Sequence, residues 1–217
     1  MKHFTLPKEG GLIETGIPSD ILHSYEKIRT EIYDQSTTAS EVIADTIIDA
    51  INASKEKTFK LGLSTGVTPV SLYKWLTRKY QEGKVSFKNV EVYSIDEYYP
   101  YGKGEPQSRN KILHTSLLNA VDIKEENIHI PDGSVPGDKI SAYCEEYDKM
   151  ARNLDMLVIG MGEAGQVGFN EAGSTPSSRT RTVLLSYQSR KRQGKNFNGD
   201  FKHTPSEAIT VGIDTMM

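Results

Sequence analysis

The chain has 217 residues, of which 36% are hydrophobic and 25% charged, and its 26 basic and 29 acidic side chains leave a net charge of −3. This composition is that of an ordinary globular domain with enough chain to form a core, and it excludes disordered, collagen-like and coiled-coil proteins. The near balance of charge lacks the basic excess of a nucleic-acid-binding protein, so we expect no nucleic-acid partner.

A single cysteine, Cys144, excludes an intrachain disulfide and is typical of a reducing compartment. The N-terminal residues lack the apolar stretch of a signal peptide. The longest apolar run, residues 156–161, is far shorter than the ~20 residues that a membrane span needs. The five histidines are dispersed and none has a ligand-like neighbour, so no metal site is supported. The sequence therefore predicts a soluble, cytoplasmic protein without a metal and without a membrane partner.

Residues 1–30 show scattered glycines and prolines, and we expect them to form an extension packed on a core domain of residues 31–217. A capping box at 38–41 predicts the start of a helix whose apolar positions keep the 3.6-residue period. A short strand at 60–63 and a turn follow, and Pro69 fits the first turn of a second helix.

The rest of the chain alternates strand and helix patterns. Further strands are predicted at residues 90–95, 128–130 and 156–159, and further helices near residues 107–120 and 138–152. Residues 96–100 (DEYYP) and a polar, glycine-rich loop follow 90–95, and the very apolar strand 156–159 would be buried on both faces if it were central in the sheet. Residues 209–217 begin as a strand and stop without a docking helix, so we expect a domain truncated at its C-terminus. This order predicts an open, mostly parallel, Rossmann-like α/β sheet with helices on both faces and ligands at the carboxyl ends of its strands.

The first of three unusual strand ends covers residues 63–69, where small hydroxylated residues and a glycine lie between strand and helix. Backbone N–H groups, the hydroxyls of Thr65 and Thr68 and the helix N-terminus would together suit a phosphate. No Gly-Lys-Ser/Thr follows, so this is not a Walker A loop. An ordinary strand-to-helix turn is the alternative.

The second strand end carries the adjacent carboxylates Asp96 and Glu97. At the carboxyl edge of a buried strand, such a pair could hold a general base or a metal. The alternative is that both are solvated loop acids.

The third strand end carries Gly160, Gly162 and Gly165 in the spacing G-x-G-x-x-G. The acid that a dinucleotide-binding fingerprint requires about 20 residues later is missing, so we expect no nicotinamide or flavin cofactor. The glycines still allow close approach of a ligand to the backbone. A basic stretch follows, and one of its cations could close over a phosphate. Its members are Arg179, Arg181, Arg190, Lys191, Arg192 and Lys195.

Several stretches together carry a family resemblance. They are LGLSTGVTPVSLY (61–73), VYSIDEYYP (92–100), PQS (106–108), VDIKEENIHIPDG (121–133), DMLVIGMGEAGQVGFNEAGS (155–174), SRTR (178–181) and EAITVGI (207–213). In this order they resemble the glucosamine-6-phosphate deaminase/isomerase family, which is related to 6-phosphogluconolactonase. Gly-Phe-Asn-Glu at 168–171 looks like the deaminase version. Residues 25–33 look similar to deaminase-like domains that are sometimes fused to a PIG-L-type deacetylase domain.

The resemblance implies isomerisation and deamination of an amino-sugar 6-phosphate (glucosamine 6-phosphate to fructose 6-phosphate plus ammonia) without a cofactor. It implies that Asp96 is the enolising base and that Glu171 orients a ring-opening histidine. It places substrate and phosphate contacts on Thr65, Gly66, Val67, Thr68, Gly160, Gly162 and Lys195. It also allows a homo-oligomer and a fused C-terminal domain.

The sequence departs from the family pattern at positions that matter. The ring-opening Asp-Gly-His of the family reads Ala164-Gly165-Gln166 here, which removes both titratable groups. Val67 replaces a loop glycine, and a family phosphate lysine would lie beyond residue 217. Ser174 and Arg181 match the effector pocket of the allosteric members, of which about half is kept.

These departures leave alternatives open. The second hypothesis is a non-catalytic domain that binds a sugar phosphate as a sensor or regulator. A weaker third is lactone hydrolysis of the 6-phosphogluconolactonase type, which would also need the missing histidine.

Overall fold

A computed structural model describes residues 30–217, apart from 55–56 and 67. The predicted extension over residues 1–30 therefore lies outside the described residues, except for Thr30, and so does Val67.

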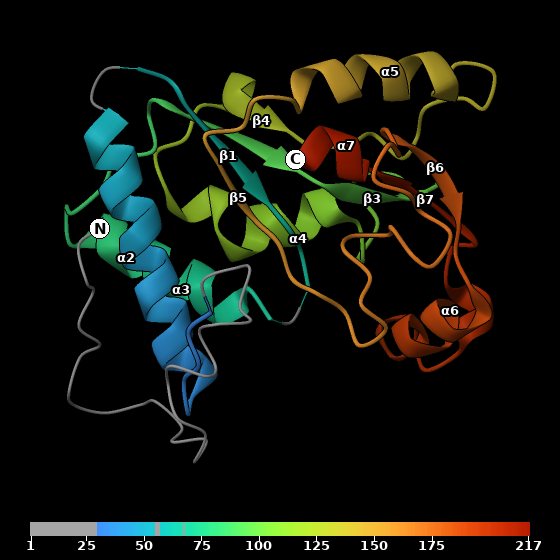
Figure 1. Ribbon diagram of the computed structural model, residues 1–217, viewed down its shortest axis with the longest axis horizontal. Coiled ribbons are helices and arrows are strands. Elements are labelled where there is room, and N and C mark those ends of the chain that lie inside the picture. Colours follow the sequence, from blue (N-terminus) through green and yellow to red (C-terminus); the bar gives the residue numbers. More distant parts are fainter. Residues whose placement is uncertain (1–29, 55–56, 67) are drawn as a thin grey trace.

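A four-stranded parallel sheet forms the centre of the structure (Figure 1). Its strand order is β4-β2-β1-β5. The bounds are Phe59–Leu63 for β1, Val90–Ser94 for β2, Ile128–His129 for β4 and Met156–Val158 for β5. Helices cover both faces, so the predicted α/β architecture is confirmed.

The strand near 156–159 is not central, because β5 lies at the end of the sheet order. Its residues are only partly buried, and the side chain of Ile159 that follows is 44% exposed. An apolar run indicates that a strand packs on a core, but it does not specify the neighbours on either side. The two central strands are instead β1 and β2, in which most residues are buried.

Three helices contribute to the core on one face of the sheet, and α5 (Ile140–Met150) packs on the other (Figure 1). The three are α2 (Ser36–Ser54), α3 (Val70–Gln81) and α4 (Arg109–Ser116). The predicted capping box at 38–41 is not the helix start, because α2 already begins at Ser36 and the Ser40 hydroxyl donates to the Ser36 carbonyl at 2.7 Å.

A second, antiparallel sheet has the order β3-β7-β6. It consists of β3 (Asp96–Tyr99), β6 (Arg181–Leu184) and β7 (Glu207–Thr210). The sequence analysis assigned no strand to residues 96–99, where β3 lies, and did not predict β6. All four residues of β3 are buried, so the alternation that indicates a strand is absent.

Short elements complete the chain. They are α6 (Tyr187–Gln193), α7 (Ile213–Met216) and the 3₁₀ helices Leu118–Ala120, Glu125–Asn127, Gly194–Asn196 and Phe201–His203. The expectation that no helix follows the last strand is wrong, since α7 does. Among the helices described, none combines the length and the apolar character needed to cross a membrane.

Candidate functional site

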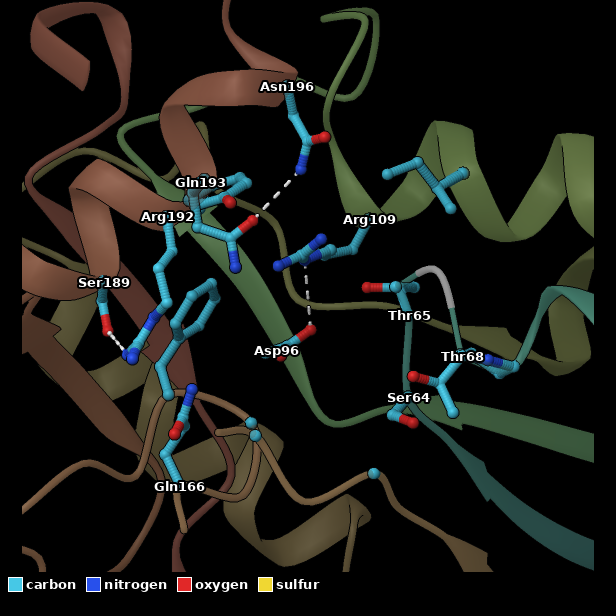
Figure 2. Close-up of a pocket in the computed structure, with 18 of the residues that line it drawn as sticks. Ser64, Thr65, Thr68, Asp96, Arg109, Gln166, Ser189, Arg192, Gln193 and Asn196 are labelled. Carbon is cyan, nitrogen blue, oxygen red and sulfur yellow. Dashed lines mark hydrogen bonds and ion pairs between the residues drawn. The ribbon is translucent and has the colours of Figure 1, made fainter. Parts of the chain in front are cut away.

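The segments after β1, β2 and β5 meet at one edge of the parallel sheet. Leu63 is in register with both Ser94 and Val158, so the three strands end level with one another. A cavity of about 390 Å³ lies at this edge (Figure 2). Its lining includes the predicted positions Thr65, Gly66, Thr68, Asp96, Gly160, Gly162, Gln166, Glu171 and Lys195. Ala164, Ser174 and Arg181 do not line it.

The loop after β1 presents hydroxyl groups and a helix N-terminus to the cavity. The Tyr73 hydroxyl, from α3, donates to the carbonyl of Ser64 and fixes the start of this loop. Gly66 has φ of +141°, a conformation that a side chain would resist. Thr65 Oγ1 is buried without a hydrogen-bond partner among the described residues. Together these groups are able to bind an anion.

Asp96 lies where the parallel sheet passes into the antiparallel one. The preceding residue, Ile95, donates its N–H to the Leu63 carbonyl at 3.3 Å and accepts at its carbonyl from Val211 at 2.8 Å. The Asp96 side chain is only 6% exposed, and its Oδ1 lies 3.4 Å from Nε of Arg109. Burial raises the pKa of this carboxyl, while the guanidinium of Arg109 acts in the opposite direction.

Glu97 serves the fold instead of the cavity, which it does not line. Its Oε1 accepts the backbone N–H groups of Tyr98 and Arg109 at 2.8 and 2.9 Å, and its Oε2 accepts that of Asn110 at 3.1 Å. Burial raises the pKa of Glu97 to about 7, against the effect of these three donors. The alternative of two solvated loop acids is therefore wrong, since both carboxylates are buried. Over the described part of the chain, no group of three or more potential ligands could hold a metal ion.

The glycine-rich segment after β5 forms a tight turn. The N–H of Gly162 donates to the Gln166 carbonyl at 2.8 Å, and that of Gly165 donates to the Gly162 carbonyl at 2.8 Å. A Cβ on Gly162 would lie 2.2 Å from Nε2 of Gln166, so only glycine leaves room for this amide. The amide oxygen of Gln166 accepts the N–H of Ala164 at 3.0 Å. The side chain that replaces the family histidine thus lies against the turn, at the cavity wall.

Glu171 reaches the cavity from the same segment. Its Oε2 accepts the N–H of Ser186 at 3.2 Å. Its Oε1 is buried and has no hydrogen-bond partner among the residues described. One carboxylate oxygen thus supports the backbone at Ser186, and the other is available to accept a hydrogen bond.

Two members of the basic stretch, Arg192 and Lys195, line the cavity. Arg192 donates to the Ser189 hydroxyl at 3.1 Å, which holds it against α6 (Figure 2). Arg181 donates instead to the hydroxyl of Ser174 at 2.9 Å. The two predicted effector positions therefore contact each other outside the cavity.

Sequence reasoning missed Arg109. Its guanidinium lies 4.7 Å from the ring centre of Tyr98 and 5.3 Å from that of Phe169, and it points into the cavity (Figure 2). The only signal was its place directly after the Pro-Gln-Ser motif at 106–108. A motif does not show that a charged side chain is buried beside a carboxylate 13 positions earlier.

A model of the family "Glucosamine-6-phosphate isomerases/6-phosphogluconolactonase" matches residues 34–192. The chain belongs to this family. It is similar to a solved monomeric glucosamine-6-phosphate deaminase, with 31% identity and a TM-score of 0.78 over 84% of this chain and 75% of that one. A 6-phosphogluconolactonase from Thermotoga maritima has 18% identity and a TM-score of 0.62, covering 81% and 74% of the two chains. One from Trypanosoma brucei has 16% identity and a TM-score of 0.63, covering 83% and 74%. At such identities the two lactonases indicate the shared fold alone.

Proposed function

We propose that this protein isomerises and deaminates an amino-sugar 6-phosphate, converting glucosamine 6-phosphate to fructose 6-phosphate and ammonia. One observation carries the proposal. A buried carboxylate, Asp96, has an oxygen without a hydrogen bond from the described residues, on the wall of the cavity that the hydroxyl-bearing loop of Thr65 and Thr68 also lines. A proton-abstracting group and an anion-binding loop in one cavity suit a sugar phosphate that must lose a carbon-bound proton.

The loop at residues 65–68 and the ammonium group of Lys195 bind the phosphate through charge-assisted hydrogen bonds. With the sugar in its open-chain form, Asp96 takes the proton from C2 and returns it to C1. The product is an imine at C2, which water hydrolyses to release ammonia. Glu171 assists the reaction from the same cavity wall, through its Oε1, which has no hydrogen-bond partner among the described residues.

Ring opening is the weak step of this enzyme. It needs one proton removed from the C1 hydroxyl and one delivered to the ring oxygen. Gln166 has no proton to transfer at neutral pH. The protein therefore depends on the open-chain form that arises in solution, and turnover of the cyclic sugar is slow.

Ammonia release from glucosamine 6-phosphate tests the proposal. Asp96→Asn should abolish it, because the amide cannot accept the C2 proton. Glu82→Gln, which removes an exposed carboxylate paired with Arg78, is the control and should leave the rate unchanged. Wild-type protein that binds fructose 6-phosphate but releases no ammonia, even over long incubation, would contradict the proposal.

The replaced residues Ala164 and Gln166 favour a second candidate, a sugar-phosphate-binding domain without turnover. It predicts tighter binding of fructose 6-phosphate than of fructose, with no ammonia released. Hydrolysis of 6-phosphogluconolactone, assayed on the same samples, tests the weaker third candidate.

A further inference from the structure

Asp96 and Arg109 form a buried charged pair that is not completed by the protein itself. Their side chains are 6% and 9% exposed, respectively, and Asp96 Oδ1 is 3.4 Å from Arg109 Nε. Neither of these two atoms makes a hydrogen bond to any of the residues described. Buried polar atoms are nearly always paired, so unpaired ones on a cavity wall indicate the position of a ligand group.

Arg109 is held in place by its backbone and by two aromatic rings. Its backbone N–H donates to Glu97 at 2.9 Å, which fixes the start of α4. The guanidinium lies over the rings of Tyr98 and Phe169, which hold its plane. Figure 2 shows it directed to the middle of the cavity, above Asp96. A cation that is fixed by packing, and whose Nε–H has no hydrogen-bond partner among the described residues, is arranged to donate to a ligand.

We propose that Arg109 is a further catalytic residue, which binds the carbonyl oxygen of the open-chain sugar and stabilises the negative charge that forms there when Asp96 removes a proton from the neighbouring carbon. This inference rests on the proposed function. It identifies the group that polarises the substrate, in a cavity whose histidine position carries Gln166.

The step balances without any further reactant. The carboxylate of Asp96 takes the proton, the C–H electron pair forms a carbon–carbon double bond, and the carbonyl π pair moves onto the oxygen. Arg109 donates hydrogen bonds to this oxygen while the proton is held on Asp96. Returning the proton to the other carbon reverses the shift.

The same pair sets the charge of the base. Arg109 favours the ionised form of Asp96, the form that accepts a proton, and so opposes the rise in pKa caused by burial. The other titratable groups facing Asp96 are the phenols of Tyr73, Tyr98 and Tyr147, from α3, β3 and α5, and burial raises the pKa of each. They are neutral over the working pH range, which leaves Arg109 as the cation that faces this carboxylate among the groups described.

Exchange of the C1 protons of fructose 6-phosphate in D₂O, followed by NMR, isolates this step, because it needs neither ammonia nor the opening of an aldose ring. Arg109→Met keeps the packing volume and removes the donors, and it should slow exchange by ~10²–10³-fold, as removal of one oxyanion donor does. Arg109→Lys keeps the charge without the fork and should recover part of the rate. The matched control is Arg78→Met, which removes an exposed arginine stacked 5.1 Å from Trp75. It should exchange like wild type.

Two further readouts separate catalysis from a structural role. In Arg109→Met the acid limb of the pH–rate profile should move to higher pH, because Asp96 loses its neighbouring cation. Affinity for fructose 6-phosphate should change only a few-fold.

Exchange as fast as wild type with an unmoved acid limb would overturn the role of Arg109 and leave the proposed function standing. A large loss of affinity with full exchange at saturation would also overturn it, since Arg109 would then only bind the sugar phosphate. No exchange by the wild type would overturn the proposed reaction and this step together.

Discussion

Glu97 offers a quantitative test of how the site is held together. Its carboxylate accepts three buried backbone N–H groups, two of which begin α4, the helix that carries Arg109. Glu97→Ala leaves all three without an acceptor, and at ~1 kcal/mol for each the loss is about 3 kcal/mol. For a chain of this length, each 1 kcal/mol lowers the melting temperature by roughly 2–4 °C. We therefore expect a fall of about 6–12 °C.

Ser108→Ala is the matched control on the same helix. Ser108 is the N-cap of α4, and its hydroxyl accepts one N–H, from Lys111 at 3.0 Å. Its removal should lower the free energy of unfolding by about 1 kcal/mol. Denaturant unfolding at a pH below the raised pKa of Glu97 measures both variants. Equal losses, or a smaller loss for Glu97→Ala, would refute the assignment of Glu97 as the main support of α4.

Three further predictions concern charge and chemistry. The pKa of Glu97 is raised from 4.5 to about 7, so the stability linked to its protonation is fully present below 4.5, the pKa in the unfolded chain, and is lost as the pH rises through about 7. The difference in free energy of unfolding between wild type and Glu97→Ala should therefore shrink over this range. Lys195→Ala should weaken binding of fructose 6-phosphate by ~10–100-fold in calorimetry, as expected for a charge-assisted bond, whereas Lys191→Ala, outside the cavity, should not. The double substitution Ala164→Asp with Gln166→His should raise turnover of glucosamine 6-phosphate by ~10²–10⁴-fold, and no gain with the sugar phosphate still bound would favour the binding-domain hypothesis.

Much of the cavity lining followed from the sequence because it depends on one rule, that parallel strands of a sheet end at a common edge. The segments after β1, β2 and β5 were each recognisable by small or acidic residues after an apolar run. Their meeting point needed only the parallel order. The antiparallel sheet did not follow, because β3 is buried at every position and therefore shows no alternation.

Arg109 could not be predicted for a different reason. Its place depends on Glu97, which is 12 residues earlier and which looked like one half of a functional acid pair. Only the structure separates the two neighbours, with Asp96 on the cavity wall and Glu97 on the start of α4. Motif spacing shows which residues come together at a strand end, but it does not show which of two adjacent side chains faces the ligand.

The local structure also explains how the histidine position could change without loss of the cavity. Asp96 is fixed by the strands on either side of it, through the backbone bonds of Ile95 to Leu63 and Val211. The turn that carries Gln166 is held by its own backbone, through the bonds of Gly162 and Gly165, and the side chain at 166 contributes only one contact to that turn. In the proposed reaction, binding of the sugar phosphate and proton transfer at Asp96 therefore depend on the sheet, whereas ring opening depends on the side chains at positions 164 and 166 of this turn. For this reason the enzyme and the binding-domain hypotheses share a single cavity, and proton exchange on an open-chain sugar is the measurement that distinguishes them.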